Sequence, residues 1–195
     1  MNLPNKLTIA RIILAPFFMI FLLIDNIYLR YLATLIFIVA ALTDAYDGYL
    51  ARKTGVITGF GKFMDPLADK ILVSTAFVSF VALDYVQTWM VLVIILREFL
   101  ITGFRSLAAY KGVVILPSYL AKWKTGCQMT VIIIILLFIN LKSTLVPLGY
   151  NWSILTKNSA LRVFDVMIFV TMLLTVGSAI DYLIKNAFLL KGVLK

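Results

Sequence analysis

Six long apolar runs follow one another along this chain, with only short polar segments between them. Hydrophobic residues make up 63% of the sequence, and the mean hydropathy is +1.03. A soluble domain of this length needs a polar exterior, which a charged content of 14% is too low to supply. Runs of about 20 apolar residues are instead typical of helices that cross a bilayer. The sequence therefore predicts an all-α fold, a polytopic membrane bundle of six transmembrane helices.

The limits of the predicted spans follow from where the apolar runs begin and end. Residues 1–195 are expected to form one integral-membrane domain, because no linker, low-complexity tract or second domain interrupts the series. The first run is expected to be retained as a span, since no small-residue cleavage pattern follows it. The six predicted spans run from about Leu7 to Ile24, Leu29 to Arg52, Pro66 to Leu83, Thr88 to Ala109, Tyr119 to Leu141, and Leu161 to Ile184.

The distribution of basic residues predicts the orientation of this bundle. Most of the 18 Lys and Arg residues lie on the side that holds both termini and the segment between the second and third spans. Because basic loops stay in the cytoplasm, we expect this side to be cytoplasmic. The basic residues lie at the ends of apolar runs rather than along one polar surface, which argues against a nucleic-acid partner despite the net charge of +9. The opposite side keeps only Arg30, Lys142, Lys157 and Arg162.

Four of the nine acidic residues lie around the junction between the second and third predicted spans. Asp44 and Asp47 are three residues apart, and Asp65 and Asp69 are four apart, so each pair shares one face of a helix. If the two helices meet, four carboxylates converge at the edge of a low-dielectric medium, where they require cations. Oxygen ligands without His or Cys nearby favour Mg²⁺, Mn²⁺ or Ca²⁺ over zinc. The sequence therefore predicts a metal site built from these four acids.

The residues around the acids suit a phosphorylated ligand. Gly48 leaves room for a ligand beside the helix, and Arg52 offers a planar fork that matches a phosphate. Three glycines between positions 55 and 61 are expected to interrupt the helix so that the chain turns back. Pro66 is expected in the first turn of the next helix, which leaves Asp65 an alternative role as a simple N-cap. Ionisable residues at a membrane edge are nevertheless functional by default.

The stretch from Asp44 to Asp69 resembles the full signature of the CDP-alcohol phosphotransferase family, and reads Asp44-x2-Asp47-Gly48-x2-Ala51-Arg52-x8-Gly61-x3-Asp65-x3-Asp69. The wider chain is most similar to the branch that transfers a phosphatidyl group from CDP-diacylglycerol to sn-glycerol 3-phosphate. The likeness covers roughly residues 3–130, while the last third matches only in its hydrophobic pattern. Further matching segments are Pro4-Asn5-x-Leu7-Thr8-x2-Arg11, Arg97-Glu98-Phe99, Arg105 and Lys122-x-Lys124-Thr125.

The resemblance implies a membrane enzyme, usually a homodimer, in the bacterial cytoplasmic membrane. It implies two divalent cations, Mg²⁺ or Mn²⁺, in a cavity that opens to the cytoplasm. Asp44 and Asp65 would bridge both ions, Asp47 would bind one ion, and Asp69 would bind the other. Asp69 would also be the catalytic base. The CDP part of the donor would contact Gly48, Arg52, Thr58, Asn5 and Thr8.

The implied reaction joins the 1-hydroxyl of sn-glycerol 3-phosphate to the β-phosphorus of CDP-diacylglycerol and expels CMP. Since the acceptor carries its own phosphate, a second basic site is expected, with Arg97, Arg105, Lys122 and Lys124 as candidates. The alternatives are snorkelling for the two lysines and an ion pair of Arg97 with Glu98. We also expect Glu98 to pair with Arg105, which lies seven residues further on and shares its helix face.

Two other functions are compatible with the same acids. Within the family, the acceptor could be inositol phosphate, or phosphatidylglycerol as in cardiolipin synthesis. From a different class, a cation transporter could also use four membrane carboxylates. A transporter, however, favours acids near the bilayer midplane and two related halves, and this chain has neither feature.

Overall fold

The computed structural model describes residues 3–54, 59–110, 119–149 and 159–193 of the chain. Within these ranges, the side chains of residues 3–6, 45–54, 59–63, 65–66, 110, 119–122, 159 and 187–193 are not described. The described residues form helices joined by turns, with no strand among them, so the all-α prediction is confirmed. The helices are α1 (Leu3–Leu23), α2 (Ile27–Thr54), α3 (Gly59–Ala82), α4 (Thr88–Tyr110), α5 (Tyr119–Leu145) and α7 (Ser159–Val193).

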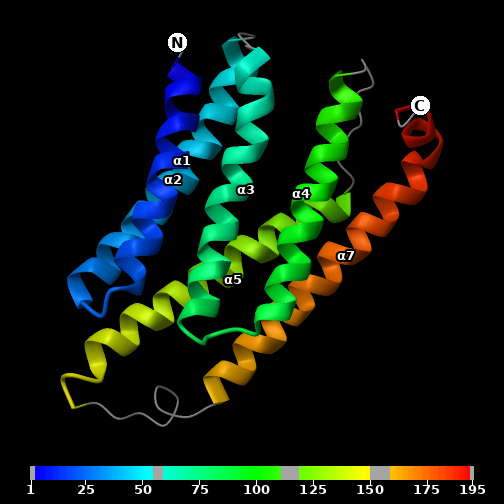
Figure 1. Cartoon of the computed structure of the whole chain (residues 1–195). Helices are drawn as coiled ribbons and strands as arrows, with labels where there is room; N and C mark the ends of the chain where they lie inside the picture. The colour runs from blue at the N-terminus through cyan, green and yellow to red at the C-terminus, as the bar shows by residue number, and fades with distance from the viewer. Residues whose placement is uncertain (1–2, 55–58, 111–118, 150–158, 194–195) are drawn as a thin grey trace.

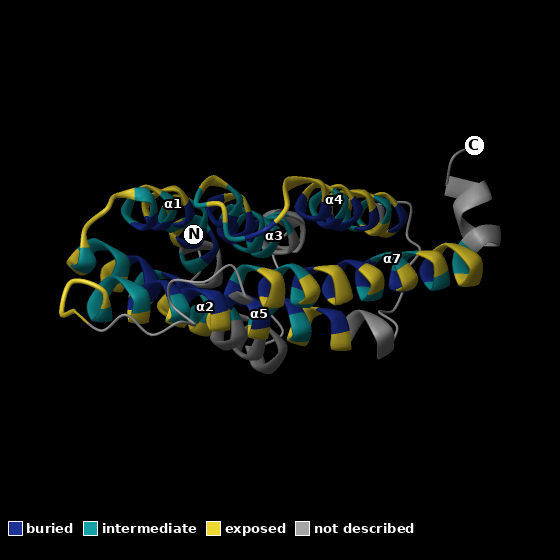
Figure 2. Ribbon diagram, turned by 90° about the horizontal axis from the view of Figure 1, so that it is seen from below, coloured by how far each residue is buried: buried dark blue, intermediate teal, exposed yellow. Residues whose placement is uncertain are grey.

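The helices are arranged in two layers. Figure 2 shows α1, α3 and α4 in one row and α2, α5 and α7 in the other. The N-terminal ends of α1 and α3 lie at the same end of the bundle as the C-terminal ends of α2, α4 and α7 (Figure 1). Helices α5 and α7 are tilted relative to α1 and α3 and pack against each other. This arrangement brings α1, α2 and α3 into mutual contact, with α5 closing the group from the second layer.

Three helices are long and apolar enough to cross a membrane, over Ile27–Asp44, Trp123–Leu145 and Ala160–Asn186. A shorter apolar stretch covers Leu7–Leu23 in α1. Helix α4 does not qualify because Arg97, Glu98 and Arg105 lie within it. In α3 the side chains are described without a gap only over residues 67–82, a stretch too short to test as a span. Three of the six predicted spans are therefore supported by the length and apolar character of their helices.

The core is built from one apolar stripe on each helix. On α3, for example, Leu72, Ala76 and Phe80 repeat every four residues and are buried. Aromatic pairs connect helices between and within the layers: Phe18 of α1 lies 5.5 Å from Phe37 of α2 in the other layer, and Phe138 of α5 lies 5.0 Å from Phe164 of α7 in the same layer, measured between ring centroids. These stripes fix which face of each helix points inward.

Helix α3 begins earlier than the sequence predicted. Gly59 is the first residue of α3 and Gly61 lies in its first turn, whereas Pro66 lies in the interior of the helix rather than in its first turn. Asp65 is therefore not an N-cap. Proline and glycine are tolerated inside membrane helices because neighbouring helices and local adjustments satisfy the freed backbone groups. Helix α1 likewise contains Pro16.

The turn after α3 reverses the chain into α4. The amide of Tyr85 donates to the carbonyl of Phe80, and the amide of Asp84 donates to the carbonyl of Val81. Asp84 adopts a left-handed conformation with φ of 57°. These features form a Schellman cap, in which Asp is one of the few residues other than glycine that accept the left-handed position. The turn places α4 antiparallel to α3.

Candidate active site

Three charged residues continue the apolar stripes of α1, α2 and α3 toward the end of the bundle where α2 ends and α3 begins. Each therefore points the way the core residues point, into the space between helices. Each also lies about one helical turn from a buried core residue of its own helix: Arg11 from Ala15, Asp44 from Ala40, and Asp69 from Leu72.

Arg11 joins the two described acids of the motif. Its Nη1 donates to Oδ1 of Asp44 at 2.6 Å and also to Oδ1 of Asp69. The Arg11 side chain is 1% exposed, whereas each carboxylate is 37% exposed. Because one nitrogen contacts both acids, Asp44 and Asp69 lie within two hydrogen-bond lengths of each other. The predicted meeting of the helices that carry the two acid pairs is thus observed for one acid of each pair.

A cavity of about 70 Å³ lies beside these acids. A cavity of this volume is large enough to hold water-sized groups. Charged and polar side chains from four helices share its wall with apolar ones, so the site is open to an ion or a substrate oxygen. The lining residues are Arg11, Ala41, Asp44, Asp69, Lys70, Leu72, Val73, Thr125, Gln128 and Met129.

The described part of the site fits a hard divalent cation. Asp44 and Asp69 offer carboxylate oxygens that converge from two helices, which is the ligand type that Mg²⁺ and Mn²⁺ prefer. The described side chains form no cluster of three potential metal ligands. The side chains of Asp47 and Asp65 are not among the described residues. Asp47 follows Asp44 on α2, and Asp65 precedes Asp69 on α3, each by about one turn.

A second charged group surrounds Glu98, which is 3% exposed. The Glu98 cluster comprises Glu98 with Lys70, Arg97, Lys124 and Gln128. Lys70 Nζ lies 2.9 Å from Oε2 of Glu98, and Oε1 accepts from Arg97 Nη1 at 3.1 Å and from Lys124 Nζ. Gln128 Nε2 donates to the same oxygen at 3.3 Å. Three cations thus share one buried carboxylate, which leaves the cluster with excess positive charge.

The predicted acceptor residues divide between this cluster and the exterior. Arg97 and Lys124 are buried in the Glu98 cluster, and the alternative ion pair of Arg97 with Glu98 is formed. Arg105 is exposed, and the expected pair of Glu98 with Arg105 is wrong. Cations from α3 and α5 reach Glu98 across the helix contacts and occupy both its oxygens. The side chain of Lys122 lies outside the described residues.

The predicted CDP contacts are described only at one position. Thr8 is fully buried on α1, one turn before Arg11 and on the same face. Its burial agrees with an inward-facing position at this end of the bundle. The side chains of Asn5, Gly48, Arg52 and Thr58 lie outside the described residues.

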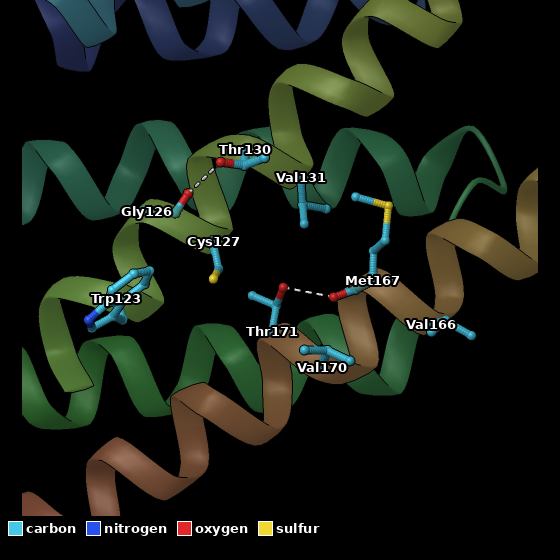
Figure 3. A pocket seen from close by; sticks show the side chains of 9 residues that line it. All are labelled: Trp123, Gly126, Cys127, Thr130, Val131, Val166, Met167, Val170 and Thr171. Atoms are coloured by element: carbon cyan, nitrogen blue, oxygen red, sulfur yellow. Dashed lines mark hydrogen bonds between the residues drawn. The ribbon is translucent and has the colours of Figure 1, made fainter.

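A larger apolar groove of about 630 Å³ lies elsewhere, between α5 and α7 (Figure 3). Its polar hydroxyls are already used within their own helices, since Thr130 donates to the carbonyl of Gly126 and Thr171 to that of Met167. Among the described residues that line it none is charged, so we assign the chemistry to the smaller cavity. The lining residues are Trp123, Gly126, Cys127, Thr130, Val131, Val166, Met167, Val170 and Thr171.

Sequence reasoning missed three residues that line the cavity. Arg11 was seen only as part of the family resemblance, although it stands at the spacing of the buried stripe of α1. A charge at a core position is costly unless it is paired, and this signal could have identified it. Lys70 adjoins Asp69 and counts in the sequence only as one of the Lys and Arg residues on the predicted cytoplasmic side. Gln128 is buried and had no sequence signal beyond its polarity within an apolar run.

Comparisons with known proteins identify the family of the chain. Residues 1–177 match the sequence profile of the CDP-alcohol phosphatidyltransferase family, so the likeness extends well past residue 130, the limit that the sequence motifs indicate. A CDP-diacylglycerol–glycerol-3-phosphate 3-phosphatidyltransferase of Bacillus subtilis (strain 168) is 41% identical over 197 residues, covering 95% of each chain. The enzyme of that name from Rickettsia typhi is 43% identical over 136 residues, covering 70% of this chain and 76% of its own.

A third relative comes from Escherichia coli (strain K12) and carries the same name. It is 41% identical over 133 residues, covering 66% of this chain and 72% of its own. The family profile covers most of the chain, including the residues that meet at the cavity, and the Bacillus relative is similar over nearly its whole length. This chain therefore belongs to the CDP-alcohol phosphatidyltransferase family and is a transferase.

Proposed function

We propose that this protein transfers the phosphatidyl group of CDP-diacylglycerol to the 1-hydroxyl of sn-glycerol 3-phosphate, giving phosphatidylglycerophosphate and CMP. The relatives named for this reaction support the choice of substrates. The observation that carries the chemistry is the meeting of Asp44 and Asp69, from two helices, on the wall of one polar cavity. Two acids at one site suit a reaction in which a diphosphate must be bound and a hydroxyl deprotonated.

Asp44, Asp47, Asp65 and Asp69 would hold two divalent cations, Mg²⁺ or Mn²⁺. When bound, such ions neutralise diphosphate oxygens and stabilise the charge on the leaving CMP. The convergence of Asp44 and Asp69 supports this assignment, and the helical spacing of Asp47 and Asp65 is compatible with it. Gly48, Arg52, Thr58, Asn5 and Thr8 would contact the CDP part of the donor.

Asp69 would act as the base. It would take the proton from the 1-hydroxyl of the acceptor while the hydroxyl oxygen attacks the β-phosphorus and the bond from that phosphorus to the CMP oxygen breaks. Arg11 contacts Asp69 and Asp44 together, so it would orient both carboxylates toward the cavity. Since phosphoryl transfer depends mainly on positioning and charge, such orientation is a substantial part of what the protein supplies.

The acceptor phosphate would bind on the positively charged side of the cavity. Lys70 lines the cavity next to Asp69 and belongs to the Glu98 cluster with Arg97 and Lys124. The excess positive charge of this cluster is complementary to a phosphate, and an uncharged acceptor would leave it unpaired. Arg105 and Lys122 would contribute at the outer edge.

The protein would work as a single domain over residues 1–195, as six membrane spans and as a homodimer. Both termini and the cavity would face the cytoplasm. The clustering of Lys and Arg at one side of the predicted spans supports this orientation. The shared end of α1, α2, α3, α4 and α7 in Figure 1 is compatible with it.

An acceptor panel tests the proposed reaction. Purified protein with CDP-diacylglycerol and Mg²⁺ should release CMP with sn-glycerol 3-phosphate, but not with inositol phosphate or phosphatidylglycerol. Asp69→Asn should abolish this release without loss of folding, because the amide cannot accept the proton. Asp165→Asn is a matched control, since Asp165 lies on α7 and, among the described residues, accepts from the Gln87 amide at 3.2 Å without lining the cavity. CMP release with one of the other acceptors instead would show that the acceptor is not sn-glycerol 3-phosphate. Activity of the Asp69→Asn variant would show that Asp69 is not the base.

A further inference from the structure

Glu98 is the most heavily contacted carboxylate among the described residues, yet the proposed reaction gives it no task. Lys70 approaches it from α3, Arg97 from its own helix, and Lys124 and Gln128 from α5. On the far side, Arg97 Nη2 donates to Ser178 Oγ of α7 at 2.7 Å. One buried acid thus connects four helices.

The energetics of this cluster favour a role beyond packing. A buried ionic group rarely stabilises a fold more than apolar side chains of the same volume would. Its presence therefore indicates that its charged side chains are held at specific positions for another reason. Here the cations outnumber the acid, and Arg97, Glu98 and Lys124 are all buried. Such an excess is unfavourable in a low-dielectric interior unless an anion approaches it.

Two members of the cluster also face the cavity beside Asp69. Lys70 and Gln128 both line it, and both have their side-chain nitrogens fixed by Glu98. Lys124 stands directly before Thr125, another lining residue. Glu98 itself does not line the cavity, so it would act on a ligand only through these neighbours.

We propose that Glu98 is a positioning residue for the acceptor phosphate. It holds Lys70 and Gln128 at the cavity wall, within reach of the phosphate of an acceptor whose hydroxyl group lies at Asp69. Ser178 extends the same support through Arg97. This inference rests on the proposed function and adds to it the residue that fixes the acceptor end of the site. Without the Glu98 charge, the three cations repel one another and leave these positions.

The central variant is Glu98→Gln, which keeps the shape of the side chain and removes its charge. We expect the KM for sn-glycerol 3-phosphate to rise about tenfold or more, the effect of losing one hydrogen bond to a charged group. The KM for CDP-diacylglycerol and the kcat at saturating acceptor should stay near their wild-type values. Glu98→Asp, which keeps the charge, should recover most of the acceptor affinity.

Ser178→Ala provides a milder test at a distance from the cavity. It removes the hydroxyl that holds Arg97 and should raise the KM for the acceptor in the same direction but by less. Ser79→Ala is its matched control, because Ser79 is equally buried but donates only to the carbonyl of Thr75 within α3. This control should leave both KM values unchanged.

A direct binding measurement separates positioning from stability. Equilibrium dialysis of radiolabelled sn-glycerol 3-phosphate, with inorganic phosphate as competitor, should show weaker binding to Glu98→Gln at a temperature where thermal unfolding shows the variant folded. Equal losses for donor and acceptor, or a lower melting temperature with unchanged acceptor binding, would overturn the proposal. If Glu98→Gln does not fold, the proposal is still tested by the acceptor KM of Glu98→Asp and by the acceptor KM of Ser178→Ala compared with that of Ser79→Ala. Wild-type protein that turns over a different acceptor would contradict the proposed function instead.

Discussion

At the scale of single residues, the most informative one is Arg11. A guanidinium that is 1% exposed inside an apolar bundle is tolerated only when it is paired, and its partners include Asp44 and Asp69, two acids of the sequence motif. The same contacts therefore stabilise the fold and position the two carboxylates at the candidate site. They hold α1, α2 and α3 together at the end of the bundle where the cavity lies.

Replacing Arg11 should destabilise the protein. Arg11→Met leaves Asp44 and Asp69 close together without a cation, and breaking a buried pair costs about 3–5 kcal/mol. Because each carboxylate is 37% exposed, solvent screens part of this loss, and we expect about 3 kcal/mol. The free energy of unfolding, measured by titrating SDS into detergent micelles, checks this value.

The control for this variant is Lys185→Met. Lys185 pairs with Asp181 one turn away on α7, but its side chain is 65% exposed. Removing it should cost no more than about 0.5 kcal/mol. Similar losses for the two variants would show that Arg11 is not held by its acids.

At the scale of elements, a polar seam fixes α2 against α5. Asn140 donates to Thr34 Oγ1 at 2.7 Å, and Arg30 donates to Ser143 at 2.6 Å. The participants repeat at helical spacing on both helices, so they face one another in a single register. In an apolar environment such hydrogen bonds specify which faces meet, because packing of apolar side chains alone discriminates weakly.

Thr34→Val tests this seam with almost no change in volume. The Asn140 amide loses its partner while it stays buried, so we expect the free energy of unfolding to fall by about 1 kcal/mol. Thr130→Val is the matched control, because Thr130 is exposed and donates to the carbonyl of Gly126 in its own helix. A loss as large in the control as in Thr34→Val would mean that the interhelical bond contributes nothing.

At the scale of the whole molecule, the alternation of helix directions sets the topology. The α1–α2 connection and the α3–α4 turn lie at one end of the bundle, and the C-terminal end of α4 lies at the other (Figure 1). Arg11, Asp44 and Asp69 meet toward the second of these ends. The proposed orientation therefore puts the cavity on the cytoplasmic side.

Cysteine labelling checks this orientation. In a Cys127→Ala background, a cysteine at Asp25, whose side chain is 93% exposed, should react with a membrane-impermeant maleimide added to intact cells. A cysteine at Ala109, exposed near the end of α4, should react only after the membrane is permeabilised. The reverse pattern would place the cavity outside the cell, and labelling of both positions in intact cells would contradict six spans.

The sequence by itself determined the features that depend on the order of residues along a single segment. Apolar runs predicted the helices to within a few residues at most ends. Acids at helical spacing predicted two pairs that each share a face, and the structure describes Asp44 and Asp69, one acid of each pair. The boundary of α3 was wrong because glycine and proline lower helix propensity only as a local preference, which packing against a neighbouring helix such as α1 can override.

Only the tertiary structure decided which charges meet. Periodicity reports the faces of one helix, but Arg11 meets Asp44 and Asp69 across three helices, and Glu98 meets Lys70 and Lys124 instead of its helix neighbour Arg105. These choices depend on how the helices cross and which side chains can reach across the gap. An ion pair is therefore set by distances between residues far apart in the chain, which no spacing along a single helix encodes.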